Sequence, residues 1–171
     1  MWQAGRVAVL ARVVAVLASV GVVLAGCEGA GEEPTPAGHA VRARVLRVID
    51  GDTIEVSIVG REEDVRYIGV DTPETVKPGT PVQCYGPQAK AENRRLVARK
   101  AVRLVFDRER RDVYGRLLAY VHAGSRFVNA ALVRRGYART LTIPPNTGHA
   151  ARLRRLELEA GQDGRGLWGS C

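Results

Sequence analysis

Residues 41–70 read VRARVLRVIDGDTIEVSIVGREEDVRYIGV, and the architecture follows from the pattern in this stretch. Val41 to Ile49 is rich in β-branched residues, and Thr53 to Val59 alternates apolar and polar side chains, so both segments are predicted strands. The step Asp50-Gly51-Asp52 between them is typical of a tight hairpin turn. A third strand is predicted from Asp64 to Val70. The folded region therefore begins with three consecutive strands.

Further along the chain, helices alternate with two more strands. Gly86-Pro87 opens a helix that is predicted to reach Arg99, because proline suits the first helical turn. Strands are predicted at 101–106 and 117–122, and helices at 127–135 and from a cap at Asn146-Thr147 to Gly161. Five strands with interleaved helices predict an α+β, mainly β fold, namely an OB-fold five-stranded β-barrel with three helices.

The N-terminal residues have a different character from the predicted barrel. Arg6 and Arg12 precede an apolar run from Val13 to Ala25, as in an export signal. This run of about 13 residues is shorter than the roughly 20 that a transmembrane helix needs. The predicted organisation is a lipoprotein signal peptide at 1–26, a flexible Gly- and Pro-rich tether at 27–40 and one folded domain at 41–171.

The three cysteines suggest two different uses. Leu24-Ala25-Gly26-Cys27 resembles a bacterial lipobox, in which the cysteine is lipidated and becomes the new N-terminus. We therefore expect an exported protein that is anchored to the cell membrane through a lipid on Cys27, or, if the signal is an ordinary cleaved one, a secreted protein. Cys84 and Cys171 would then lie in an oxidising compartment, where they either pair or remain free, and the sequence leaves both states open.

Composition narrows the class of partner. The chain has 26 basic and 18 acidic residues among 171, a net charge of +8, and only 5% aromatic residues. So few aromatic residues argue against a binder that works mainly by stacking bases on a surface of rings. Without the two arginines of the signal, the remainder carries 24 − 18 = +6. This basic charge should raise the rate of association with a polyanion such as nucleic acid.

Residues able to support phosphodiester chemistry gather at one strand turn and one strand end. A hard cation such as Ca²⁺ takes oxygen ligands, and the carboxylates of Asp52 and Asp71 could supply two. Arg66 and Arg116 could hold phosphoryl oxygens where charge develops. Glu74 follows Asp71 on a segment stiffened by proline, and it could orient or deprotonate the attacking water.

Each of these features also has a purely structural interpretation. Asp50-Gly51-Asp52 could be only a turn, the sequence Asp-Thr-Pro-Glu at 71–74 could cap a helix, and arginines are often solvated. Their combination at a strand turn and a strand end favours catalysis.

Over residues 41 to 168 the chain resembles the staphylococcal nuclease-like family, also called thermonucleases. The resemblance rests on IDGDT at 49–53, VRYIGVDTPET at 65–75, YGP at 85–87, DVYGRLLAY at 112–120 and VNAALV at 128–133. It implies an OB-fold barrel and a Ca²⁺-dependent nuclease that cleaves DNA and RNA and leaves 3′-phosphates. We expect the protein to act on these substrates as a monomer.

The same resemblance implies roles for individual residues. Ca²⁺ would be held by the Asp52 and Asp71 carboxylates and the Thr72 carbonyl, with Asp50 in the outer shell. The catalytic residues would be Arg66, Glu74 and Arg116. Tyr114 would lie beside a terminal phosphate of a bound nucleotide. Within this scheme Glu74 is the general base and the two arginines bind the scissile phosphate. So small a ligand set predicts Ca²⁺ affinity in the roughly 10⁻⁴ to 10⁻³ M range.

Two departures from the family pattern affect substrate binding, not phosphate chemistry. Val113 stands where the family often has a lysine that touches phosphate, and 139–146 lacks the tyrosines that line the nucleotide pocket in some members. Two other functions are compatible with the composition: a noncatalytic OB or tudor-like nucleic-acid-binding lipoprotein, and an envelope or DNA-uptake lipoprotein in which cleavage is incidental. The intact acidic and arginine set argues against the noncatalytic binder.

Overall fold

The structure is a computed structural model that describes residues 39–75, 79 and 81–171. The predicted signal peptide, most of the predicted tether and the lipidation candidate Cys27 lie outside these residues. None of the helices in the described ranges combines the length and apolar character that a membrane-spanning helix needs.

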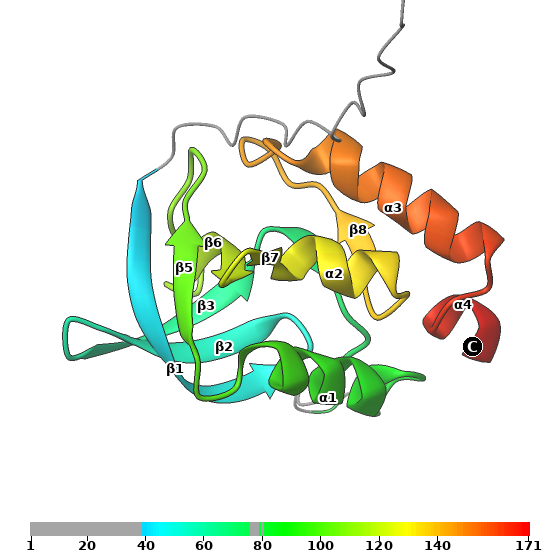
Figure 1. The fold of residues 1–171 in the computed structure, drawn as a ribbon, viewed down its shortest axis with the longest axis horizontal. Helices are drawn as coiled ribbons and strands as arrows, with labels where there is room; N and C mark the ends of the chain where they lie inside the picture. Colours follow the sequence, from blue (N-terminus) through cyan, green and yellow to red (C-terminus); the bar gives the residue numbers. More distant parts are fainter. Residues whose placement is uncertain (1–38, 76–78, 80) are drawn as a thin grey trace, which may run out of the picture. The chain divides into compact units, whose positions relative to one another are not determined.

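Within these residues, five strands close into a barrel (Figure 1). The strands are β1 (Ala40–Asp50), β2 (Thr53–Ile58), β3 (Arg61–Tyr67), β5 (Ala101–Val105) and β6 (Leu117–Ala123). β1 lies antiparallel between β2 and β5, β2 pairs with β3, and β5 pairs with β6. β3 and β6 then pair in parallel, with Val65 opposite Leu117, and this pairing closes the barrel. The predicted OB-fold β-barrel is confirmed.

The alternating pattern of the strands fills the barrel interior. Ile54 and Val56 of β2 and Leu104 of β5 are fully buried. Successive side chains of a strand point to opposite faces, so one face of each strand supplies the core. Tyr67 at the end of β3 is also buried, and its hydroxyl donates to Asn93 Oδ1 at 2.9 Å, which satisfies the one polar group that this ring brings into the core.

In the described part of the chain, three helices pack around the barrel, as predicted. They are α1 (Gly86–Val97), α2 (Val128–Arg134) and α3 (Ala150–Gln162), and a single turn, α4 (Leu167–Ser170), follows at the C-terminus (Figure 1). α1 begins with a proline in its first turn. α3 buries Leu153, Leu156 and Ala160, which lie on one face at helical spacing.

The strand predicted from Asp64 to Val70 is in fact two strands. β3 ends at Tyr67, and β4 (Gly69–Asp71) leaves the barrel to pair with β8 (Arg139–Leu141). Gly69 makes the break, because its φ is +78° and a Cβ there would lie 2.6 Å from Leu153 Cδ1. The change of direction places Asp71 on a second, two-stranded sheet opposite Arg139.

The start of α3 also differs from the prediction. Asn146-Thr147 does not cap the helix, which begins at Ala150 after His149 and has no side-chain cap. Asn146 instead bonds the backbone of Glu109: its Oδ1 accepts from the Glu109 N–H at 2.8 Å, and its Nδ2 donates to the Glu109 carbonyl at 2.9 Å. This pair fixes the loop that leads into the Asp112 motif.

Cys84 and Cys171 form a disulfide, with their Cα atoms 6.0 Å apart. The bond joins Cys84, two residues before α1, to Cys171, the residue after α4. The question that the sequence left open is therefore answered by the structure.

Candidate active site

The turn between β1 and β2 presents Asp52 to the end of β4. Asp52 Oδ2 accepts hydrogen bonds from the backbone N–H of Thr72 at 2.8 Å and from its hydroxyl at 2.9 Å, while Oδ1 accepts from Thr53 Oγ1 at 3.0 Å. Gly51 permits this approach, because a Cβ at that position would lie 2.6 Å from Thr72 Oγ1. The turn and the strand end are thereby held together.

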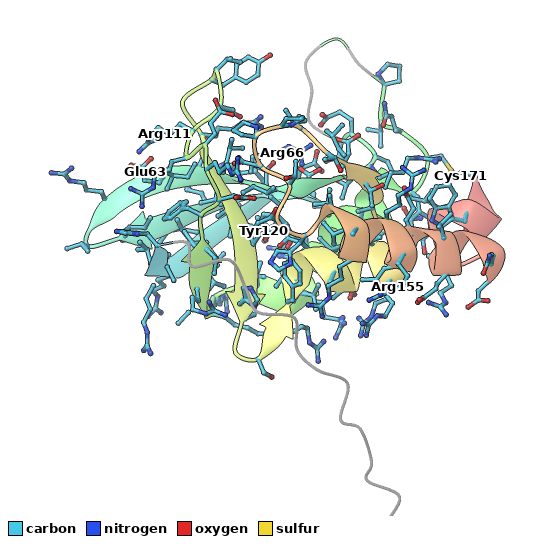
Figure 2. The ribbon with its side chains drawn as sticks, turned by 90° about the horizontal axis from the view of Figure 1, so that it is seen from above. Glu63, Arg66, Arg111, Tyr120, Arg155 and Cys171 are labelled. Carbon is cyan, nitrogen blue, oxygen red and sulfur yellow. A yellow bond between two sulfur atoms is a disulfide. The ribbon has the colours of Figure 1, made fainter. Side chains whose placement is uncertain are left out.

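Arg66 links the two carboxylates that the sequence assigned to a metal. Its Nη1 forms an ion pair with Asp52 Oδ2, and its Nη2 donates to Asp71 Oδ1 at 2.8 Å. The side chain of Asp52 is 7% exposed and that of Asp71 is 53% exposed, so the network opens to solvent on the Asp71 side. Figure 2 labels Arg66.

Asp50 connects the same turn to the segment that carries Glu74. Its Oδ1 accepts from the Thr75 hydroxyl at 2.7 Å and its Oδ2 accepts from the Thr75 N–H at 3.3 Å, and that N–H also donates to Glu74 Oε1 at 3.0 Å. Burial raises the pKa of the Asp50 carboxyl, and the nearby Glu74 carboxyl adds to the rise, although the hydrogen bonds from Thr75 oppose it. Glu74 is thus placed beside the turn through Asp50 and Thr75.

Arg116 is held by a compact turn that Asp112 organises. Asp112 Oδ1 accepts from the backbone N–H groups of Tyr114 and Arg116, each at 3.0 Å, and Oδ2 accepts from Arg116 Nε at 2.7 Å. Gly115 in the middle of the turn has a φ of +84°. The Arg116 guanidinium carbon also lies 5.4 Å from the centre of the Tyr114 ring, whose residue is 81% exposed.

A cavity of about 370 Å³ joins the two arginines. Arg66, Tyr114 and Arg116 line it together with the aliphatic residues Leu141 and Ile143. The segment 139–146, which has no tyrosine, contributes Leu141 and Ile143, so this side of the cavity wall is aliphatic. Such a wall can contact a nucleoside through dispersion, without the stacking that rings provide.

The oxygen donors suit a hard cation. Two carboxylates and a backbone carbonyl are ligand types that Ca²⁺ prefers, and the half-exposed Asp71 leaves a path from solvent. In the part of the chain that the structure describes, no three His, Cys, Asp or Glu side chains form a metal-binding cluster. Arg66 occupies the same two carboxylates, so a bound cation would have to share or replace those contacts.

The structure brings five of the predicted residues together in two linked groups, whereas Glu74 is connected to the β1–β2 turn through Thr75 and Asp50. Asp52, Asp71 and Arg66 share one ion-pair network, and Arg66, Tyr114 and Arg116 share one cavity. Thr72 contacts Asp52 through its N–H and hydroxyl, and the ligand role that the resemblance implies for its carbonyl stays a prediction.

The structure adds two residues that sequence reasoning did not select, Thr75 on Asp50 and Gln83 on Glu74. It also gives a contact to Asp112, which begins the motif at 112–120 and had no assigned role: its carboxylate holds Arg116. Thr75 and Gln83 acquire their contacts only through the tertiary fold.

Comparison with known proteins agrees with this geometry. A family model described as staphylococcal nuclease homologue matches residues 64–170. The thermonuclease of Staphylococcus intermedius is 46% identical over 124 residues, which cover 72% of this chain and 74% of that protein. The thermonuclease of Staphylococcus hyicus is 43% identical over 125 residues, 73% of this chain and 74% of that protein. Endonuclease YncB of Bacillus subtilis is 45% identical over 130 residues, 75% of this chain and 62% of that protein.

Proposed function

The chain belongs to the staphylococcal nuclease family and is a micrococcal-nuclease-type endonuclease, and from this premise we propose that it cleaves DNA and RNA in a Ca²⁺-dependent reaction that leaves 3′-phosphate ends. The observation that carries the proposal is the position of Arg66, which contacts the Asp52 and Asp71 carboxylates and also lines the cavity shared with Arg116. The site can therefore present positive charge and carboxylates to the same phosphodiester.

The two guanidinium groups keep donors available for phosphate. An arginine has five N–H donors, and a fork of two can bind a phosphate in a bidentate manner. Arg66 uses Nη1 and Nη2 in its contacts with Asp52 and Asp71, and Arg116 uses Nε and Nη2 on Asp112. Within the described residues, Nε of Arg66 and Nη1 of Arg116 make no hydrogen bond or ion pair. These donors would stabilise the charge that develops on the phosphoryl oxygens.

Glu74 would take the proton from the attacking water. The water oxygen forms a bond to phosphorus and the bond from phosphorus to the 5′ oxygen breaks. The 5′ oxygen takes a proton from solvent water and leaves as a hydroxyl, so the phosphate stays on the 3′ side. A base must be ionised to accept a proton. The Thr75 N–H donates to Glu74 Oε1 at 3.0 Å, and a hydrogen bond of this kind favours the ionised carboxylate.

Asp52, Asp71 and the carbonyl of Thr72 are the residues that would hold Ca²⁺. When bound, the cation would polarise a phosphoryl oxygen and offset the negative charge of the phosphodiester. The chain supplies the orientation of these ligands: Thr72 donates twice to Asp52, and Arg66 fixes Asp71 at 2.8 Å.

The test is an assay of the full chain on plasmid DNA and on RNA, with Ca²⁺ and with a chelator, followed by analysis of the product ends. We expect degradation of both substrates with Ca²⁺, loss of activity with the chelator, and 3′-phosphate with 5′-hydroxyl ends. Full activity in the presence of the chelator would contradict the metal assignment, and 5′-phosphate ends would contradict the assigned direction of cleavage.

Export and lipid anchoring form a separate part of the proposal. The apolar run at 13–25 and the sequence Leu24-Ala25-Gly26-Cys27 support attachment of the mature chain to the cell membrane through Cys27. A Cys27→Ala substitution should move the protein from the membrane fraction to the medium. If the membrane fraction of the variant matched that of the parent, the anchor would have to lie elsewhere.

A further inference from the structure

Glu74 is held by a neighbour that lies nine positions further along the chain. Its backbone N–H donates to Gln83 Oε1 at 2.9 Å, and the backbone N–H of Gln83 donates to the Glu74 carbonyl, also at 2.9 Å. Two hydrogen bonds of opposite direction thus join the main chain of Glu74 to Gln83. The position of the carboxylate therefore depends on how firmly Gln83 itself is held.

Gln83 is followed directly by Cys84, which is bonded to Cys171. The C-terminal segment that carries Cys171 is attached to the domain: Leu167 of α4 is buried, and its N–H donates to the Gly136 carbonyl at 2.8 Å. A Cβ on Gly136 would lie 2.0 Å from the Arg165 carbonyl oxygen, which shows how closely this segment packs against the end of α2. The disulfide thus joins the residue next to Gln83 to a fixed part of the structure.

A ring contact supports the same connection. The Tyr85 ring stacks on the Tyr137 ring with centroids 5.4 Å apart. Tyr137 follows Gly136, so the residue after Cys84 contacts the same end of α2 to which the C-terminal segment is attached. Figure 1 shows α4 beside the segment that leads into α1, and Figure 2 labels Cys171 on this side of the domain.

We propose that Gln83 and the Cys84–Cys171 disulfide are positioning residues for Glu74, so that opening the disulfide lowers the turnover of the nuclease. The proposal depends on the general-base role given to Glu74 above. Both cysteines are exposed, so a small thiol reductant can reach the disulfide. A dithiol would break the bond between the sulfur atoms and leave a thiol on each cysteine, and would itself be oxidised to a disulfide, with two electrons and two protons passing to the protein.

The expected effect falls on turnover more than on substrate binding. A base that is displaced by about 1 Å can cost about 10²-fold in rate. The arginines and the aliphatic cavity wall, by contrast, lie on β3, on the Asp112 turn and on the segment that begins with β8. We therefore expect kcat to fall about tenfold or more on reduction while KM changes less than about twofold.

The experiment uses the full chain with Cys27→Ala, so that the remaining cysteines are Cys84 and Cys171. kcat and KM are measured before and after treatment with dithiothreitol, and again after reoxidation, which should restore turnover.

Variants provide the controls. A Cys84→Ser/Cys171→Ser double variant should have the same low kcat as the reduced chain and should not respond to dithiothreitol. With the disulfide intact, Gln83→Leu should lower kcat, whereas Gln83→Glu retains an acceptor oxygen at the same reach and should keep turnover near that of the parent.

Amide hydrogen exchange gives a readout that does not need activity. Reduction should speed exchange at Glu74, whose N–H is bonded to Gln83, and should leave exchange at Thr72, whose N–H is bonded to Asp52, unchanged.

The outcomes separate the two proposals. An oxidised chain without nuclease activity would refute the proposed function, and exchange at Glu74 would still test the positioning. If reduction lowered only the thermal stability, with kcat and Glu74 exchange unchanged, the disulfide would merely fasten the C-terminus and the inference would be wrong. Should the double variant fail to fold, the Gln83→Leu and Gln83→Glu pair decides.

Discussion

At the scale of single residues, the two arginines of the site are paired with acidic side chains. Arg66 contacts two carboxylates and Arg116 contacts one, so each guanidinium is oriented before any substrate arrives. Charge-assisted bonds of this kind fix geometry as well as supplying energy. The acidic residues therefore position the arginines in the free protein, and the same arginines offer their remaining donors to a phosphodiester.

Replacement of the general base should separate chemistry from folding. Glu74→Gln keeps the size of the side chain and an oxygen that can accept from Thr75, but the amide cannot take a proton from water. We expect kcat to fall by roughly 10²- to 10⁴-fold, with the melting temperature unchanged within experimental error. The control is Glu159→Gln on the exposed face of α3, which should leave kcat unchanged. A Glu74→Gln variant with parental turnover would remove Glu74 from its assigned role.

The side chains that sequence reasoning found are those with a local pattern. Asp52 stands in a recognisable turn, and Arg66 and Asp71 lie five residues apart around the end of one predicted strand. Gln83 has no such pattern, because its bonds to Glu74 join residues nine positions apart and form only in the tertiary fold. Pairwise contacts of this kind depend on tertiary structure, and no local propensity reports them.

Among the secondary-structure elements near the site, the turn between β1 and β2 carries a strict steric requirement. A Cβ on Gly51 would meet three side-chain atoms of Thr72, at 2.6, 2.8 and 2.8 Å. Thr72 is buried and its hydroxyl is bonded to Asp52, so it cannot move aside freely. The turn therefore has to pass within van der Waals contact of the β4 end for Asp52 to reach it.

Gly51→Ala should consequently destabilise the protein and impair the site. Overpacking of this kind typically costs about 1–3 kcal/mol, and the displaced turn should also lower activity at saturating Ca²⁺. Gly161→Ala in α3 is the matched control, since its Cβ would meet only Trp168 Cδ2 at 4.0 Å and alanine favours a helix. Urea unfolding of the two variants checks the prediction. Equal stability of Gly51→Ala and the parent would show that the turn tolerates a side chain.

The elements were predicted well where periodicity is strong and less well at their ends. β1, β2, β5 and β6 occupy the predicted segments within a residue or two. The third strand was predicted as continuous because its apolar pattern runs through Gly69, whereas the positive φ of that glycine ends the strand. The start of α3 was misplaced because Asn146 has the chemistry of a cap but uses it on Glu109.

In the domain as a whole, a cluster of rings joins β6, β7 (Arg126–Phe127) and α3 on the barrel surface. His122 stacks on Phe127 at 4.9 Å between centroids, and Phe127 also contacts His149 at 4.9 Å. Burial lowers the pKa of His122 from 6.5 to about 4, and the charges of Arg103, His149 and Arg152 act in the same direction. The folded state therefore holds this imidazole neutral.

This shift predicts acid sensitivity. The folded pKa is below the unfolded one, so the stabilisation is complete above about pH 6.5 and is lost as the pH falls toward about 4. We expect the free energy of unfolding to drop by about 2 kcal/mol between pH 7.5 and pH 4.5 from this group. His122→Phe keeps the ring and removes the titration, so urea unfolding of that variant should show a smaller drop. An identical drop in both proteins would assign the acid sensitivity to other groups.

The order of elements was sufficient to predict a closed barrel, but the strand pairing that closes it was not readable from local pattern. The parallel pairing of β3 with β6 joins Val65 to Leu117, residues separated by α1 and β5. The disulfide between Cys84 and Cys171 likewise spans 87 residues. Sequence spacing alone does not identify such long-range partners, because the entropic cost of closing a loop changes little between one long loop and another.

A structure of the protein with Ca²⁺ and a nucleotide that carries a 5′-phosphate would test whether one phosphoryl group is held by both arginines beside the metal. We expect the phosphate within hydrogen-bonding distance of Arg66 and Arg116, and the cation on Asp52, Asp71 and the carbonyl of Thr72. A phosphate bound elsewhere, with Arg116 still turned only to Asp112 and no cation on the two aspartates, would contradict the proposed site.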